Sequence, residues 1–178
     1  ASALQVKPAE LVFCASATEA LHLLIRGLQP ALGGKPVAVN PGEHSACLNP
    51  LRDWSDLHTL PDLPESCALV VQMAANNETG ILYPMPQVHG AVRVKDCAQA
   101  WGKVPVDLSD CDAAAFSGHK IGGPRGAGVL WMRPGLPWTA VMEGAQERRR
   151  RGGTEDVPAI LGLAAAAEEL PERLAGNA

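Results

Sequence analysis

The chain has 178 residues, a net charge of −4 and 47% hydrophobic residues. This length is sufficient for one hydrophobic core and too short for two of ordinary size. The acidic balance gives no electrostatic reason to expect a nucleic-acid partner, and no apolar run approaches the roughly 20 residues of a membrane span.

The cysteines predict neither disulfide bonds nor a zinc site, because they are odd in number, scattered and without a Cys-x-x-Cys pair. The chain begins without the basic region and apolar core of a signal peptide. We therefore expect a cytoplasmic protein with reduced thiols and no metal. The five cysteines are Cys14, Cys47, Cys67, Cys97 and Cys111.

Short apolar runs alternate with helical patterns along the chain. One helix is predicted after Thr18, with Gly27 near its end, and another from Pro158 to about Leu170. Residues 41–64 show a weaker pattern. The alternation predicts an α/β fold with a mainly parallel sheet flanked by helices. The predicted strands are Leu11–Phe13, Pro36–Asn40, Ala68–Met73, Ala91–Lys95, Ala113–Ser117 and Gly128–Met132.

Polar residues follow four of these strands. In a parallel α/β sheet, ligands bind outside the carboxyl ends of the strands, so these segments are expected to meet at one site. Their convergence is stronger evidence than any segment alone. The four segments are Ser16–Thr18, Asn76–Asn77, Asp96–Gln99 and Ser117–Lys120.

Lys120 is the candidate nucleophile of that site. It follows an apolar strand and precedes the turn Ile121–Pro124. A lysine moved out of water toward an apolar wall has a lowered pKa and becomes a usable amine nucleophile. Such a lysine can form a Schiff base, which makes a carbonyl cofactor such as pyridoxal phosphate the first ligand to test.

The other polar segments each allow a cofactor role and a structural one. Asp96 could hold a pyridinium nitrogen and Gln99 a ring hydroxyl, or they form a helix cap beside an exposed glutamine. His44 could stack on a planar ring or lie in a surface turn. Asn77 could orient a ring substituent or stabilise a turn by side-chain-to-backbone bonds.

Two further segments could contact a phosphate group. Ser16–Thr18 opens a helix, where backbone N–H groups bind anions, although a plain N-cap is the commoner use of threonine there. Arg148–Arg151 is expected to be a solvated loop. Gly152, Gly153 and Thr154, which follow it, offer a second phosphate contact.

Taken together, these segments resemble the cysteine desulfurases of the class V aminotransferase family. The resemblance runs from about Leu11 to Ala167. It rests on short motifs that occur in the order found in the family: Ser-Ala-Thr-Glu at 16–19, Glu-His at 43–44, Asn-Asn-Glu-Thr-Gly at 76–80, Asp-Cys-Ala-Gln at 96–99, Gly-Lys-Val-Pro-Val-Asp at 102–107, Ser-Gly-His-Lys at 117–120, Gly-Pro-Arg-Gly at 123–126, Gln-Glu-Arg at 146–148 and Arg-Gly-Gly-Thr at 151–154.

The resemblance implies the large domain of the fold type I pyridoxal-phosphate enzymes, a three-layer sandwich. Pyridoxal 5'-phosphate would be covalently bound to Lys120, and Lys120 and His44 would be catalytic. Asp96 would pair with the pyridine nitrogen, and Thr154 would reach a neighbouring subunit's phosphate in a homodimer. The cofactor-binding residues implied are Ala17, Thr18, His44, Asn77, Asp96, Gln99, Ser117, Gly118, His119, Lys120 and Thr154.

The resemblance also implies what residues 1–178 lack. The family has an N-terminal arm, and a C-terminal small domain with the substrate-binding arginine and the loop that carries the sulfur-accepting cysteine. None of the five cysteines stands at that position. We therefore expect a single cofactor-binding large domain that, in isolation, binds the cofactor weakly and does not turn over cysteine.

Three functions follow as hypotheses. The first is a cysteine desulfurase-like domain, which in the complete enzyme takes sulfur from L-cysteine, releases alanine and passes the sulfur to an acceptor protein, for example in iron–sulfur cluster assembly. The second is a related pyridoxal-phosphate lyase, epimerase or transaminase. The third is a non-catalytic scaffold or subunit that keeps the fold.

Overall fold

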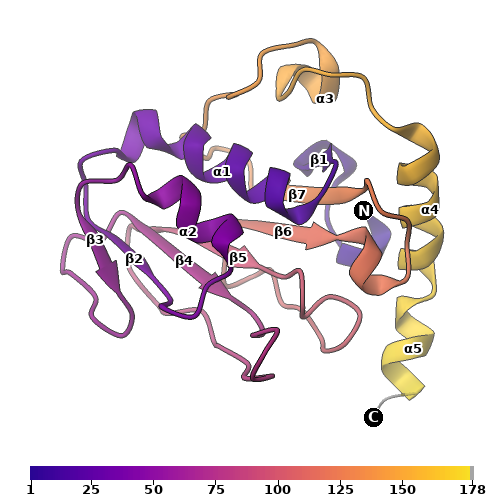
Figure 1. The fold of residues 1–178 in the computed structure, drawn as a ribbon, viewed down its shortest axis with the longest axis horizontal. Helices are drawn as coiled ribbons and strands as arrows, with labels where there is room; N and C mark the ends of the chain where they lie inside the picture. Colours follow the sequence, from indigo (N-terminus) through magenta and orange to yellow (C-terminus); the bar gives the residue numbers. More distant parts are fainter. Residues whose placement is uncertain (177–178) are drawn as a thin grey trace.

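A computed structural model describes residues 1–176, in which seven strands form one sheet in the order β1-β7-β6-β5-β4-β2-β3 (Figure 1). Five strands, from β3 at one edge to β6, pair in parallel. Strand β7 lies antiparallel between β6 and β1. The strands are β1 (Leu11–Cys14), β2 (Val37–Val39), β3 (Leu57–Thr59), β4 (Leu69–Met73), β5 (Val92–Asp96), β6 (Ala113–Ser117) and β7 (Gly128–Met132).

Helices cover both faces of this sheet. On one face, α1 and α2 pack against each other and bury a leucine-rich core. On the other face, α4, α5 and the connecting loops cover Phe116 and Trp131. The predicted α/β sandwich is therefore confirmed. The helices are α1 (Ala17–Leu32), α2 (Ser45–Leu51), α3 (Gln146–Arg149), α4 (Val157–Glu168) and α5 (Leu170–Gly176), with 3-10 turns η1 (Ser2–Leu4), η2 (Pro8–Glu10) and η3 (Gly118–Ile121).

The predicted strands are found with small changes at their ends, because central strands that are buried on both faces consist mostly of apolar residues. Strands β4, β6 and β7 are buried at every position. Their burial explains why short apolar runs were sufficient to locate them. Within residues 1–176 no helix combines the length and the hydropathy needed to cross a membrane.

Helix α1 differs from the prediction at both ends. It begins at Ala17, one residue before Thr18, because the Ser16 Oγ accepts a hydrogen bond from the Glu19 N–H at 3.1 Å and caps the helix. It also continues past Gly27 to Leu32. Gly27 serves close packing rather than termination, since a Cβ there would lie 2.0 Å from the Trp138 Nε1.

Replacing Gly27 by alanine is expected to destabilise the protein, although alanine is the better helix former by about 1 kcal/mol. The Trp138 indole cannot retreat easily, because its N–H donates to the Leu23 carbonyl oxygen at 2.9 Å. Overpacking should lower the free energy of unfolding by about 2 kcal/mol in urea titrations. The exposed neighbour Arg26→Ala should change it by less than about 0.5 kcal/mol. A more stable Gly27→Ala protein would contradict this packing argument.

The weak pattern at residues 41–64 contains two elements that were not predicted. Helix α2 is short and is capped by His44, whose Nδ1 accepts from the Ala46 N–H at 3.1 Å. Strand β3 is an edge strand paired only with β2, so its side chains are partly exposed and lack an apolar signature. The predicted C-terminal helix is divided, with α4 ending at Glu168 and α5 starting at Leu170.

Candidate functional site

A cavity of about 260 Å³ lies at the carboxyl ends of β4, β5 and β6, beside the start of α1. This position is the ligand-binding edge expected for a parallel sheet. Nine of the eleven predicted cofactor-binding residues line the cavity: Ala17, Thr18, His44, Asn77, Asp96, Gln99, Ser117, His119 and Lys120. Ser16, Leu21, Ala46, Met73, Ala75 and Ala98 complete the lining.

One end of the cavity is formed by the N-terminus of α1. The cap provided by Ser16 satisfies the Glu19 N–H, whereas the N–H groups of Ala17 and Thr18 have no partner within the helix, as at any helix start. Partial positive charge at this end favours an anion. The approach of β7 is close, since a Cβ on Gly128 would lie 2.4 Å from the Ser16 carbonyl carbon.

Side chains from the end of β6 lie at the same cavity. The Ser117 Oγ and the His119 Nδ1 are 3.0 Å apart and share a hydrogen bond. Both side chains line the cavity. Together with the start of α1, they offer hydroxyl, imidazole and backbone donors to a phosphate group.

Asp96 occupies another part of the wall, at the end of β5. Its side chain is buried, and its Oδ1 accepts from the Ala98 N–H at 2.8 Å. Burial raises the pKa of Asp96, while the bond from Ala98 and the nearby His44 act in the opposite direction. The chain forms a turn here rather than a helix, so the helix-cap interpretation of Asp96 is wrong. Its carboxyl group can face a cationic ring nitrogen.

Lys120 lies in η3, directly after β6, and its side chain lines the cavity. The sequence argument that an apolar wall removes this lysine from water is wrong, because Lys120 is exposed. The predicted turn after it is present, with Gly122 at a φ of 88°, which favours glycine. Burial and the charge of Lys120 lower the pKa of the neighbouring Lys103.

Gln99 and Asn77 line the cavity, but their side chains differ in their surroundings. The Gln99 Oε1 accepts from the Lys103 Nζ at 2.5 Å. The turn at residues 76–80 is held by Asn76, whose Oδ1 accepts from the Glu78 and Thr79 N–H groups at 2.9 Å each. The turn-forming role considered for Asn77 therefore belongs to its neighbour.

Two predicted residues do not line this cavity. Gly118 is buried beneath it, where a Cβ would lie 2.8 Å from the Ala127 carbonyl oxygen. Thr154 is exposed and belongs to the loop that follows α3. Its suggested contact with a neighbouring subunit therefore stays a prediction.

The prediction of a solvated Arg148–Arg151 loop is wrong for its second half. The Arg151 Nη1 donates to the Phe13 carbonyl oxygen at 2.9 Å, and its Nη2 pairs with Glu19 at the same distance. Arg150 donates to the Leu11 carbonyl oxygen. These contacts anchor the loop to β1 and α1, which the sequence run of four arginines did not reveal.

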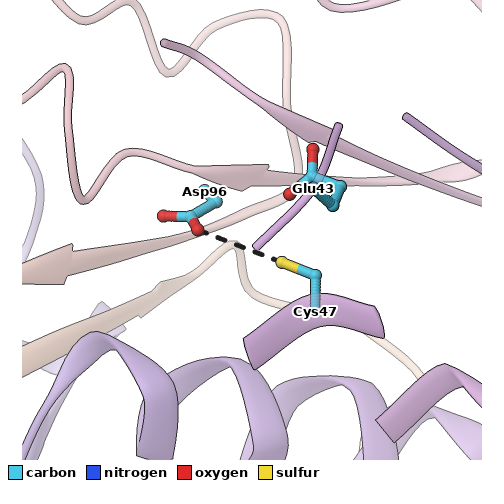
Figure 2. A group of neighbouring side chains, drawn as sticks. All are labelled: Glu43, Cys47 and Asp96. Atoms are coloured by element: carbon cyan, nitrogen blue, oxygen red, sulfur yellow. Dashed lines mark hydrogen bonds between the residues drawn. The ribbon is translucent and has the colours of Figure 1, made fainter. Parts of the chain in front are cut away.

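Glu43 and Cys47 are buried beside Asp96 and were not predicted as site residues (Figure 2). The Cys47 Sγ lies 4.0 Å from the Asp96 Oδ2. All five cysteines are free and buried, and burial raises the pKa of Cys14 to about 12. The order Pro-Gly-Glu-His suggests a surface turn, so no local signal indicates that Glu43 points inward.

The chemical groups that line the cavity suit pyridoxal phosphate. An anion-binding helix start, a buried carboxyl group and an amine surround one space, and these are the groups that a phosphate, a pyridinium nitrogen and an aldehyde require. His44 adds an imidazole to the wall. Gly128 of β7 packs directly against the start of α1, where a side chain would collide with the backbone of Ser16 and Ala17.

The chain is similar in sequence and in fold to known proteins of one family. The chain is 34% identical to the cysteine desulfurase IscS of Rickettsia prowazekii, over 89% of this chain and 46% of that protein. It is 38% identical to a cysteine desulfurase of Sinorhizobium fredii, over 94% and 44%. The chain thus spans about half the length of these relatives.

Comparison with solved structures gives relatives of the same kind. A NifS-like protein superimposes with a TM-score of 0.91 at 29% identity, over 98% of this chain and 56% of that one. DndA from Streptomyces lividans gives a TM-score of 0.90 at 33% identity, over 99% and 59%. The sequence model described as Aminotransferase class-V matches residues 1–175. The chain therefore belongs to the class V aminotransferase family.

Proposed function

We propose that this chain is the cofactor-binding part of a pyridoxal-phosphate-dependent cysteine desulfurase, which takes sulfur from L-cysteine and releases alanine. The observation that carries the proposal is the cavity in which the α1 N-terminus, Asp96 and Lys120 meet. The relatives at 34% and 38% identity, both named cysteine desulfurases, support this choice within the family.

Each part of the cavity then has a role. Ala17, Thr18, Ser117 and His119 would hold the phosphate, with Gly118 keeping the backbone close. Asp96 would hold the ring nitrogen, and His44 would stack on the ring. When bound, pyridoxal phosphate supplies an electron sink for the Cα of the amino-acid substrate.

The remaining residues complete the proposed site. Lys120 would hold the cofactor covalently and carry a proton at its Nζ between the substrate Cα and the ring. Asn77 and Gln99 would contact the ring from its edge. Thr154, which is exposed here, would contact the phosphate of a second subunit in a homodimer.

The sulfur acceptor must come from outside the described residues. An acceptor thiolate would attack the substrate sulfur, so that an S–S bond forms as the substrate C–S bond breaks. The carbon would keep the electron pair and take a proton, which gives alanine and a persulfide. Burial raises the pKa of all five cysteine thiols, which disfavours their thiolates. A cytoplasmic location would keep such an acceptor thiol reduced.

The direct test is turnover of L-cysteine by the native protein with pyridoxal phosphate. We expect alanine and, with dithiothreitol present to release the persulfide sulfur, an equal amount of sulfide. Pyruvate in place of alanine would indicate a lyase, and keto-acid exchange a transaminase. Racemised cysteine would indicate an epimerase. A protein that binds no cofactor would be the scaffold, and the proposal would be wrong.

A further inference from the structure

Glu43, Cys47 and Asp96 form a buried cluster whose ligating atoms all lie within 4.8 Å of one another (Figure 2). They come from the turn after β2, from α2 and from the end of β5. Their exposed fractions are 6%, 0% and 7%. Of the three, Asp96 lines the cavity, so the other two form a layer behind it.

The two oxygens of Glu43 have different surroundings. Oε1 accepts a hydrogen bond from the Met73 N–H. Oε2 is buried and has no hydrogen-bond partner among the described residues. A buried carboxylate with an unpaired oxygen is costly, whereas a proton on that oxygen removes the charge. The geometry therefore favours a neutral Glu43.

Electrostatics also favours a proton on Glu43. Burial, and then the charge of Asp96, raise the pKa of Glu43 to about 7, and this rise exceeds the opposing effects of the Cys47 thiol and the Met73 N–H. Asp96 is also buried, but the hydrogen bond from the Ala98 N–H and the nearby His44 favour its charged form. When one proton is left between the two carboxyl groups, it therefore lies on Glu43.

We propose that Glu43 is a positioning residue that keeps one proton beside Asp96, so that this wall of the cavity presents a single negative charge to the ring nitrogen of the cofactor. The inference rests on the proposed function and deepens it. One carboxylate balances one pyridinium charge, whereas two buried carboxylates would repel each other. Cys47 is fully buried beside both groups, with its Sγ 4.0 Å from the Asp96 Oδ2.

Metal binding is a weaker explanation of the same cluster. Two carboxyl groups and a thiol are possible ligands, but the thiol must lose its proton to bind a metal. Burial raises the pKa of the Cys47 thiol well above its usual range, and both carboxyl groups raise it further. Proton sharing requires no such ionisation.

The test is the pH dependence of urea unfolding in the native protein without cofactor, compared with Glu43→Gln. The titratable groups that face Glu43 are Asp96 on β5 and Cys47 on α2, with His44 facing Asp96. Folding raises the pKa of Glu43 from 4.5 to about 7, so the stability gained from its proton is complete below pH 4.5 and lost as pH rises to 7.

In the wild type, the folding equilibrium constant should fall up to about tenfold per pH unit between pH 5 and 7, and level off above pH 7. This component should be absent from Glu43→Gln, in which the amide is neutral at every pH. The exposed Glu65→Gln should keep the wild-type profile. Identical profiles for wild type and Glu43→Gln would overturn the proposal.

Two further measurements keep the proposal testable if Glu43→Gln does not fold. In the wild type, infrared difference spectra should show a protonated carboxyl band that disappears between pH 6 and 8, and its absence would contradict a neutral Glu43. With pyridoxal phosphate bound, the absorbance should change over the same range. Neither unfolding nor infrared spectra depend on desulfurase activity, so they test the protonation of Glu43 separately from the proposed function.

Discussion

Replacing Lys120 by alanine is expected to abolish both covalent cofactor attachment and desulfurase turnover. The Nζ is the amine of the cavity that would bond the cofactor aldehyde and then carry the substrate proton. Loss of the covalent anchor and the proton carrier together should lower kcat by at least about 10³-fold. The absorbance of lysine-bound pyridoxal phosphate should disappear, and free cofactor should be recovered by dialysis.

Lys103→Ala is the matched control for this experiment. Lys103 is a second amine close enough to Lys120 for the charge of Lys120 to lower its pKa, yet it does not line the cavity. We expect the Lys103 variant to keep the cofactor absorbance and at least half of the activity. A Lys120→Ala protein that still binds the cofactor covalently would place the Schiff base on another lysine.

Replacing Asp96 by asparagine should lower turnover by at least about 10²-fold while leaving the fold intact. An amide oxygen can still accept the hydrogen bond from the Ala98 N–H, but it cannot balance a pyridinium charge. Because burial disfavours the Asp96 carboxylate, the neutral amide should leave the thermal midpoint of unfolding unchanged or raise it. Turnover and thermal unfolding measure the two effects separately.

Asp112→Asn is the matched control, for which we expect a loss of stability and no loss of turnover. Asp112 pairs with Arg93 at 3.3 Å and with Arg133 at 3.6 Å, and it lies outside the cavity. Its replacement should lower the free energy of unfolding by about 1 kcal/mol and leave turnover near the wild-type value. If Asp96→Asn lost stability and kept its turnover, Asp96 would be a structural residue.

Much of the fold could be predicted from apolar runs. Strands β4, β6 and β7 are buried at every position, so their sequences are nearly continuous apolar runs, interrupted only by Gln72 and, at the end of β6, by Ser117. Strand β3 was missed because an edge strand has partly exposed side chains and no such run. The end of α1 was misplaced because Gly27 ordinarily marks a helix end, whereas here it makes room for Trp138.

The position of the candidate site could be predicted from the strands, but the roles of its residues could not. Residues that directly follow a strand, such as Asp96 and Lys120, must lie at the carboxyl edge of a parallel sheet. Their separate roles depend on distances that no local pattern contains. The exposure of Lys120, the contacts of Arg151 and the inward orientation of Glu43 all involve segments far apart in the chain.

The sequence by itself determined which buried segments form strands, that the sheet is mainly parallel and which polar residues stand at the ends of those strands. These properties follow from burial and chain connectivity, which act on neighbouring residues. Only the tertiary structure decided that Glu43 lies against Asp96, because the two residues belong to different strand ends that the sheet brings together. Burial is a property of the assembled core, so the charge of this wall cannot be found from either segment alone.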